Sequence, residues 1–229
     1  MEIYIDTANM DEIKKYAEYG IIDGVTTNPA LMAKEGNKDI KKIIEDISKY
    51  VKGPLSVEVI SEVAEGILEE ARKINELGDN IVVKVPAIPE GFKALSKISK
   101  EGIKTNVTMV YTVNQALLAA KMGATYVSPF VGRSHAEGGD GPKLINEISE
   151  IYKIYNFKTK ILAASMRNVI YVKQAALAGA DIATIPPSVL NDMMQSDLCD
   201  NALKGFLRDW NKLHKGKTML GDDIYESRS

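Results

Sequence analysis

Short hydrophobic runs rich in β-branched residues alternate along the chain with longer stretches of helical spacing. The runs read, in order, IYID, GVTTN, LSVEV, IVVKV, IKTNVTMV, YVSPFV, KILAAS and IATIP. Segments such as DEIKKYAEY and AEGILEEARKINEL lie between them. Parallel strands joined by helical crossovers give this alternation. Eight such units in 229 residues favour a single closed (β/α)8 barrel, the TIM barrel, over an open doubly wound sheet.

The ends of the helical stretches carry recognisable signals. Asn9 with Glu12, and Thr112 with Gln115, have the spacing of capping boxes, which predicts two helix starts. Glycine commonly ends a helix because it adopts the left-handed conformation at little cost. We expect that role for Gly20, Gly78, Gly102, Gly123 and Gly179.

A further amphipathic segment, residues 197–213, follows the eighth unit and predicts an additional C-terminal helix. Phe206 and Trp210 are four residues apart and therefore share one face. That face could pack on this barrel or on a neighbouring subunit, and periodicity does not choose between them. The polar tail, residues 221–229, is expected to be mobile. No linker composition interrupts residues 1–229, which predicts one barrel domain.

Composition narrows the class of protein. Hydrophobic residues make up 45% and charged residues 26%, and the net charge is −2, which disfavours nucleic-acid binding. No apolar run reaches the length of a membrane span, and the start MEIYIDT does not resemble a secretory signal. One cysteine, Cys199, fits a reducing compartment, so we expect a cytoplasmic protein. His135 and His214 lack metal-ligand spacing, and no G-x-G-x-x-G motif is present, so neither metal nor cofactor is expected.

Polar residues collect at the carboxyl ends of the predicted strands, where barrels carry their chemistry. Side chains alternate along a strand, so Lys84 should point into the barrel with Val82, while Val83 and Val85 face the helices. The same alternation turns Ser56 inward with Glu58, and Asn106 with Thr108. The other polar residues near strand ends are Asp6, Thr26, Thr27, Asn28, Ser128, Arg133, Ser165 and Arg167.

Each of these residues also has a purely structural interpretation. Asp6 could cap the first helix, and Asn28 before proline is a common turn residue. Lys84 and Glu58 could form a buried ion pair without catalytic function. Thr108 could merely favour a strand, and the arginines could be solvated surface charges. Their convergence on one rim of the barrel favours a functional site.

A buried lysine suits one reaction class in particular. Burial destabilises its ammonium form, and the neutral amine can attack a ketone to form an iminium that accepts electrons during C–C cleavage. Asp6 could remove the hydroxyl proton on the carbon that is released, and Glu58 with Thr108 could hold the water that iminium chemistry requires. A clamp for a terminal phosphate would consist of Arg133, Ser165 and Arg167. The implied substrate is a phosphorylated ketose.

Seven motifs occur in a specific order: IDTAN, GVTTNP, LSVEV, VVKVP, TNVT, YVSPFVGR and AAS followed by Arg167. In this order they resemble the class I transaldolase family, and its short bacterial and archaeal branch, which includes fructose-6-phosphate aldolases. The resemblance covers Met1 to about Leu213. It implies a Schiff base on Lys84, acid/base chemistry at Asp6 and a catalytic water on Glu58 and Thr108. The implied substrate-binding residues are Thr27, Asn28, Asn106, Ser128 and Phe130, with the phosphate on Arg133, Ser165 and Arg167.

Two positions favour transfer over simple cleavage. The aldolases of this branch carry glutamine at the position of Glu58 and tyrosine at that of Phe130, and Phe130 cannot protonate an enamine. The resemblance thus implies a transaldolase of the non-oxidative pentose phosphate pathway. It would move a dihydroxyacetone unit from fructose 6-phosphate or sedoheptulose 7-phosphate to erythrose 4-phosphate or glyceraldehyde 3-phosphate. The alternatives are an aldolase that releases dihydroxyacetone and a non-catalytic sugar-phosphate-binding barrel.

The resemblance also bears on assembly and on one loop. The short branch typically forms decamers of pentameric rings with the last helix on a neighbour, which implies a homo-oligomer. The loop SHAEGGDG departs from the family pattern, because His135 and Glu137 replace acidic positions. We interpret His135 as a surface loop residue.

Overall fold

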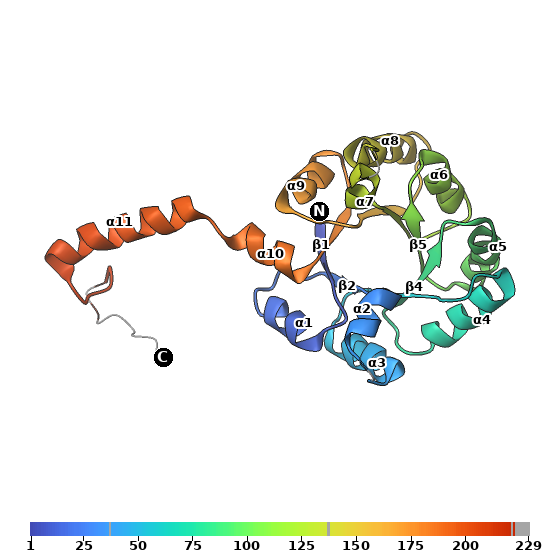
Figure 1. Cartoon of the computed structure of the whole chain (residues 1–229), viewed down its shortest axis with the longest axis horizontal. Helices are drawn as coiled ribbons and strands as arrows, with labels where there is room; N and C mark the ends of the chain where they lie inside the picture. The colour runs from blue at the N-terminus through green and yellow to red at the C-terminus, as the bar shows by residue number, and fades with distance from the viewer. Residues whose placement is uncertain (37, 137, 221, 223–229) are drawn as a thin grey trace. The chain divides into compact units, whose positions relative to one another are not determined.

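A computed structural model, which describes residues 1–36, 38–136, 138–220 and 222, contains the expected closed barrel (Figure 1). All neighbouring strands are parallel, and pairing of β1 with β8 closes the sheet. The strands are β1 Glu2–Asp6, β2 Gly24–Thr26, β3 Leu55–Glu58, β4 Ile81–Pro86, β5 Thr105–Val110, β6 Tyr126–Pro129, β7 Lys160–Ala163 and β8 Ile182–Ile185. The predicted fold class is confirmed.

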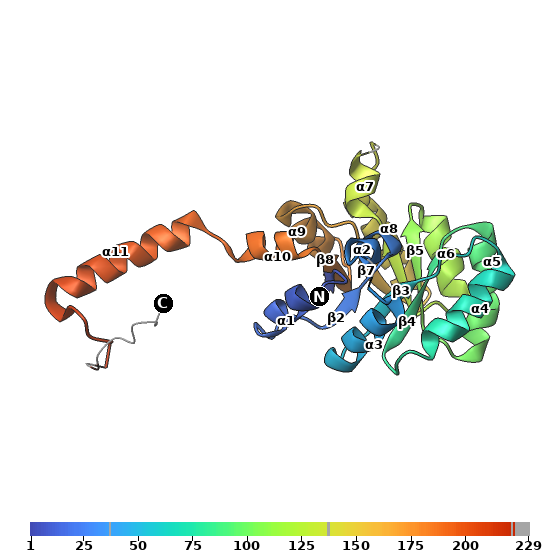
Figure 2. The same ribbon diagram turned by 60° about the horizontal axis from the view of Figure 1, so that its bottom comes forward.

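Helices surround the strands, and the structure adds short helices directly after β2 and β6. The helices are α1 Met10–Ala17, α2 Pro29–Lys34, α3 Ile40–Tyr50, α4 Ala64–Asn75, α5 Pro89–Ile98, η1 Ser99–Glu101, α6 Val113–Lys121, α7 Val131–Ala136, α8 Gly141–Ile154, α9 Val169–Leu177, α10 Pro187–Met194 and α11 Asp197–His214. Figure 2 shows α7 projecting at one end of the barrel. His135 lies in α7 rather than in a loop, while its side chain and Glu137 fall outside the described parts.

Two apolar clusters lie on opposite sides of the strands. Tyr4, Val82, Tyr126, Leu162 and Ile182 form a small cluster that fills the barrel. The alternate strand residues belong to a larger cluster between the strands and the helices, which includes Val83 and Val85. This division confirms the predicted alternation in β4. It leaves Lys84 on the inner face, two residues after Val82 in the strand.

The helix starts follow the predicted caps with one difference. Thr112 and Gln115 form a complete capping box on α6. Asn9 caps α1 through its side chain, so Asp6 does not fill that role. Glu12 returns no described hydrogen bond to Asn9, whose backbone N–H donates to Thr7 Oγ1 at 3.1 Å instead.

One predicted glycine has a different function. Gly20, Gly102, Gly123 and Gly179 all have positive φ, as expected. Gly78 is not among the positive-φ glycines and lies beyond the C-cap residue of α4. A Cβ at Gly78 would come within 2.0 Å of Ser48 Oγ, so this glycine permits close approach to α3.

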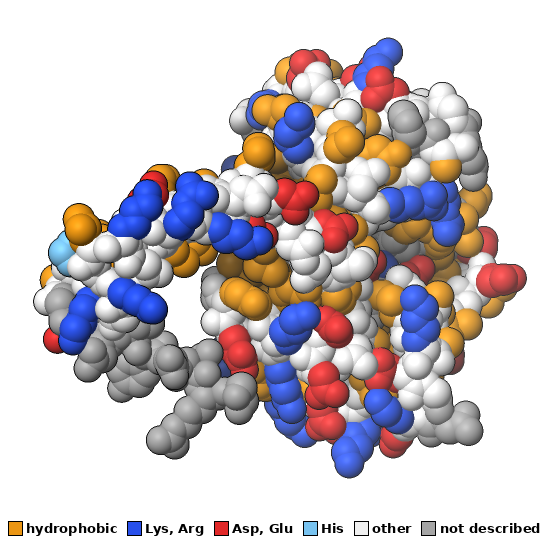
Figure 3. Space-filling model, turned by 60° about the vertical axis from the view of Figure 1, so that its left-hand side comes forward, with side chains coloured by type: hydrophobic (Ala, Val, Ile, Leu, Met, Phe, Trp, Pro, Cys, Tyr) orange, Lys and Arg blue, Asp and Glu red, His pale blue; other side chains and the backbone are white. Residues whose placement is uncertain are grey.

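The chain divides into two compact units, Met1–Asp192 and the segment from Met193 onward. The second contains α11, which matches the predicted helix to within one residue and buries none of its residues within its own segment. Trp210 stacks on His214, and its Nε1 donates to the Lys217 carbonyl at 2.8 Å. Hydrophobic and basic side chains both reach the surface of this segment (Figure 3). Apart from Asp222, the tail lies outside the described residues.

Two surface properties bear on partners. On the face of the barrel seen in Figure 3, basic and acidic side chains are interspersed. None of the helices in the described ranges combines the length and the apolar character needed to cross a bilayer.

Candidate functional site

Lys84 lies at the centre of the polar end of the barrel. Its Nζ is 2.9 Å from Glu58 Oε2 and donates to the Thr27 carbonyl oxygen, also at 2.9 Å. Strand register places Glu58, Lys84 and Asn106 side by side on β3, β4 and β5. Lys84 is only 6% exposed, so this carboxylate and carbonyl supply the partners that a buried ammonium requires. The ion pair that the sequence left as an alternative is therefore present.

Asp6 ends β1 on the same inner face. Thr26 Oγ1 donates to Asp6 Oδ1 at 2.7 Å, and the Thr26 and Thr184 hydroxyls are 2.6 Å apart. Desolvation raises the pKa of the Asp6 carboxyl, and the Thr26 hydrogen bond and the Lys84 charge only partly oppose that rise. A raised pKa suits a carboxyl that exchanges protons near neutral pH. The sequence analysis overlooked Thr184, although it lies two residues after Ile182 and shares its inward direction.

Amide and hydroxyl side chains continue the polar surface. Ser128 Oγ donates to Asn106 Oδ1 at 2.7 Å, and Asn106 Nδ2 donates to Ser56 Oγ at 3.3 Å. Asn28 Oδ1 accepts from the Leu31 N–H at 2.9 Å and caps α2. The structural interpretation of Asn28 is thus correct, but its other amide atom, Nδ2, stays available to a ligand.

These groups surround a cavity of about 160 Å³, which we call the barrel pocket. It is lined by Asp6, Thr26, Asn28, Lys84, Asn106, Ser128, Phe130, Arg133, Leu162, Ala164, Ser165 and Thr184. Most predicted site residues therefore meet here. Glu58, Thr27 and Arg167 do not line the pocket. Glu58 and Thr27 both contact Lys84, which does line it. Thr108 is fully buried, and its hydroxyl has no hydrogen-bond partner among the described residues.

The predicted phosphate clamp is held together by a close backbone approach. The Gly132 N–H donates to the Ser165 carbonyl at 3.2 Å, and a Cβ on Gly132 would lie 2.3 Å from that oxygen and 3.1 Å from Arg167 Cγ. Ser165 has a φ of 62°, a strained conformation for serine. Arg133 Cζ lies 5.7 Å from the centre of the Phe130 ring. Neither arginine pairs with a carboxylate within the described ranges, which leaves both charges for a ligand.

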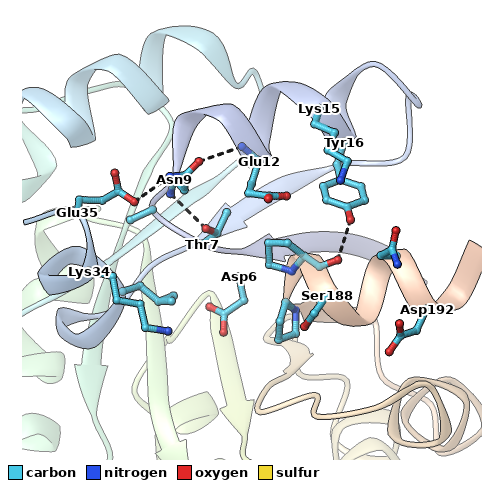
Figure 4. Close-up of a pocket in the computed structure, with 15 residues that line it drawn as sticks. Asp6, Thr7, Asn9, Glu12, Lys15, Tyr16, Lys34, Glu35, Ser188 and Asp192 are labelled. Carbon is cyan, nitrogen blue, oxygen red and sulfur yellow. Dashed lines mark hydrogen bonds between the residues drawn. The ribbon is translucent and has the colours of Figure 1, made fainter.

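A larger cavity of about 750 Å³ adjoins the barrel pocket at Asp6 and is bounded by α1, α2 and α10 (Figure 4). Figure 4 shows Lys34 on the same side of this cavity as Asp6. The Lys34 charge opposes, only weakly, the rise in the Asp6 pKa that desolvation causes. Glu12 also lines the cavity, and its buried Oε2 has no partner among the described residues. Among all the residues that the structure describes, no three His, Cys, Asp or Glu side chains cluster as a metal site would require.

Comparison with known proteins gives a consistent family. Residues 3–217 match the family described as Transaldolase/Fructose-6-phosphate aldolase. A probable transaldolase of Caldicellulosiruptor saccharolyticus is 54% identical over 216 residues, which cover 94% of this chain and 99% of the relative. Probable transaldolases of Thermoplasma volcanium (54% identical over 215 residues; 93% and 96% covered) and Aquifex aeolicus (50% over 213; 93% and 98%) are also similar. The chain therefore belongs to the transaldolase/fructose-6-phosphate aldolase family.

Proposed function

We propose that this protein is a transaldolase that forms a Schiff base through Lys84. The observation that carries the proposal is the Lys84 ammonium, buried in the wall of the barrel pocket and 2.9 Å from the Glu58 carboxylate. Glu58 can accept a proton along this contact, which leaves the neutral amine that attacks a ketone. Glu58 would thus balance the charge of the Lys84 ammonium before the reaction and take its proton when the amine attacks.

The reaction begins when the Lys84 amine adds to the ketone carbon and water leaves to form the iminium. Asp6, on the neighbouring wall of the pocket, then takes the proton from the hydroxyl on the carbon that will be released. The C–C bond between that carbon and the three-carbon unit breaks, and its electron pair flows into the iminium. An aldose phosphate leaves, and an enamine stays on Lys84. The raised pKa of Asp6 supports this exchange, since the carboxyl must both take and return the proton.

Making and breaking the iminium also requires a positioned water. Thr108 supports the predicted water site, because its hydroxyl is fully buried and lacks a partner among the described residues. Buried polar atoms are normally hydrogen-bonded to protein or to ordered water. Pro86, two residues after Lys84, lies opposite Thr108 in the sheet register. A water held by Thr108 and Glu58 would be close to the reacting carbon.

The polar groups of the barrel pocket fit a phosphorylated ketose. Asn28 Nδ2, Asn106 and Ser128 can bind the hydroxyls of the dihydroxyacetone unit. Arg133, Arg167 and Ser165 can bind the terminal phosphate, since guanidinium groups match phosphate oxygens in geometry and charge. Fructose 6-phosphate and sedoheptulose 7-phosphate are the donors we propose, with erythrose 4-phosphate and glyceraldehyde 3-phosphate as acceptors. These substrates place the enzyme in the non-oxidative pentose phosphate pathway.

Transfer is favoured over cleavage by Phe130, which lines the pocket and has no hydroxyl to protonate the enamine. The enamine then persists until an acceptor aldehyde arrives. An assay with fructose 6-phosphate and no acceptor distinguishes the two activities. Slow release of glyceraldehyde 3-phosphate, accelerated by erythrose 4-phosphate, is expected of a transaldolase. Equally fast turnover without the acceptor would show an aldolase.

The Lys84–Glu58 ion pair leaves one non-catalytic alternative, a barrel that only binds sugar phosphates. Borohydride reduction in the presence of fructose 6-phosphate tests it, because it fixes an iminium as a stable adduct. We expect mass spectrometry of the digested protein to locate the adduct on Lys84. The Lys84→Met variant should show neither adduct nor activity, while Lys15→Met should retain both. Full activity of Lys84→Met would refute the mechanism.

We further propose that several copies assemble through α11, as a decamer or a pentamer. The helix carries a stripe of large apolar side chains, Leu203, Phe206, Trp210 and Leu213, that its own segment does not bury. An apolar stripe of this size is typical of a protein interface.

The single Cys199 is a free thiol, which fits the reducing cytoplasm.

A further inference from the structure

A third cavity lies behind the Lys84–Glu58 ion pair, among α2, α3, β3 and α4. We call it the rear cavity, and its volume is about 300 Å³. It is lined by Thr27, Asn28, Pro29, Met32, Ala33, Ile40, Ile44, Val57, Glu58, Ile60, Glu70 and Ile74. Its walls are mostly apolar, and two of its lining residues, Glu58 and Thr27, contact the reactive lysine.

The Lys84 side chain separates the two cavities. Lys84 lines the barrel pocket, whereas both partners of its ammonium group, Glu58 and Thr27, line the rear cavity. The Glu58 side chain is 13% exposed although it does not line the barrel pocket. Its Oε2 lies 2.9 Å from Lys84 Nζ. Glu58 therefore contacts the lysine and also lines a cavity on the side away from the barrel pocket, where water could reach its carboxylate.

The rear cavity also reaches the protein surface. Ile60 is 72% exposed and Ile40 is 51% exposed, and Ala33 on α2 is exposed as well. Water needs polar partners to occupy a cavity, and this one supplies the Glu58 carboxylate at the end nearest Lys84. Apolar walls between the surface and that carboxylate would let water pass without binding it tightly.

We propose that the rear cavity is a water route to Glu58, separate from the opening through which substrate enters. This inference rests on the proposed Schiff-base function. Iminium formation releases one water, and hydrolysis consumes one: iminium and water give back ketone, free amine and a proton, which Glu58 accepts. Sugar phosphate fills the barrel pocket during both steps. A route behind the lysine lets water exchange with solvent while the substrate stays in place.

The test follows the ketone oxygen. Fructose 6-phosphate carrying isotopically labelled oxygen at the ketone is converted with erythrose 4-phosphate, in unlabelled water, and label in the sedoheptulose 7-phosphate is measured by mass spectrometry. Retained label is corrected for exchange without enzyme. In the wild type, water expelled at iminium formation escapes through the rear cavity, so the product loses label.

Two variants narrow the rear cavity from different walls without touching the catalytic groups. Ala33→Phe acts from α2 and Ile40→Trp from α3. Ala30→Phe is the matched control, because Ala30 is exposed on the same helix and lines neither cavity. Since a narrower route slows the escape of the expelled water, we expect at least about twofold more retained label in Ala33→Phe and Ile40→Trp, and wild-type retention in Ala30→Phe.

Two results would overturn the inference while leaving the proposed function intact. One is full retention of label by the active wild type, which would indicate a sealed site. The other is wild-type loss of label in both narrowed variants when they are folded and active. Absence of the borohydride adduct in the wild type would instead overturn the Schiff-base proposal itself. The oxygen experiment therefore separates the two failures.

Discussion

Asp6 combines a partly buried carboxyl with a hydroxyl donor, Thr26 Oγ1, at 2.7 Å. Desolvation raises its pKa in the folded protein above that of the unfolded chain. Between the unfolded and the folded pKa of Asp6, the unfolded chain loses this proton before the folded protein does. The free energy of unfolding therefore falls as pH rises through that range. Above the folded pKa, a desolvated carboxylate persists at a cost to the fold. The ionised Asp6 thus lowers the free energy of unfolding, and the same desolvation gives the site a carboxyl with a raised pKa.

We therefore predict that Asp6→Asn is more stable than the wild type at pH 8, because the amide removes a buried charge. The gain in the free energy of unfolding should shrink as pH falls through the folded pKa of Asp6, and vanish below the pKa of the unfolded chain. Urea unfolding at several pH values measures it. Transfer activity should fall about a hundredfold or more, the usual contribution of a general base. A variant less stable than the wild type at pH 8 would contradict the argument.

Much of the site at residue scale could be predicted because strand alternation is a local property. Val82 and Lys84 are two residues apart, so an inward Val82 implies an inward Lys84. The contact between Thr26 and Thr184 was not predictable in this way, since 158 positions separate the two residues. Strand order and register bring these hydroxyls together, and neither is written in any local pattern.

At the scale of elements, α2 connects a helix start to the site. Asn28 caps α2 through Oδ1 and lines the barrel pocket, and Pro29 occupies the first turn of the helix. Proline suits this position because its missing N–H would have had no partner within the helix. The sequence suggested a turn here, but six residues are too few for hydrophobic periodicity to reveal a helix. The six-residue α7 escaped prediction for the same reason.

Two substitutions should separate the capping and binding functions of Asn28. Asn28→Ser keeps an effective cap but removes the amide donor, so stability should stay near that of the wild type while activity falls on the order of tenfold. Asn28→Ala removes both and should also lower the free energy of unfolding by about 1 kcal/mol. Urea unfolding and steady-state kinetics give the two readouts. If Asn28→Ser keeps full activity, Asn28 is a cap only.

At the scale of the whole molecule, the unburied helix α11 supports the proposed oligomer. Leu203, Phe206, Trp210 and Leu213 repeat at helical spacing, while Lys204 and Arg208 lie on the opposite face. The second compact unit contains α11 and is small, and no residue of α11 is buried. The proposed oligomer would bury it.

We expect Phe206→Asp to shift the wild-type oligomer to smaller species in light scattering, because a charge replaces a large apolar side chain in the interface. Arg208→Asp is the matched control, as it introduces the same residue on the opposite face and should leave the assembly intact. Transfer activity measured alongside would show whether assembly supports catalysis. A wild-type protein that scatters as a monomer, or an unaffected Phe206→Asp oligomer, would contradict the proposal.

The sequence by itself determined the eight-fold alternation, the inner face of β4 and the complete cap of α6, because all of these depend on residues a few positions apart. It also marked the polar strand ends on which the family resemblance rests. Tertiary structure decided which of those groups share a cavity, since barrel closure and strand register bring distant segments together. Only the fold could place Glu58 and Thr27 behind Lys84 and in the wall of the rear cavity. The residues of that rear cavity come from α2, α3, β3 and α4, and no local pattern relates them.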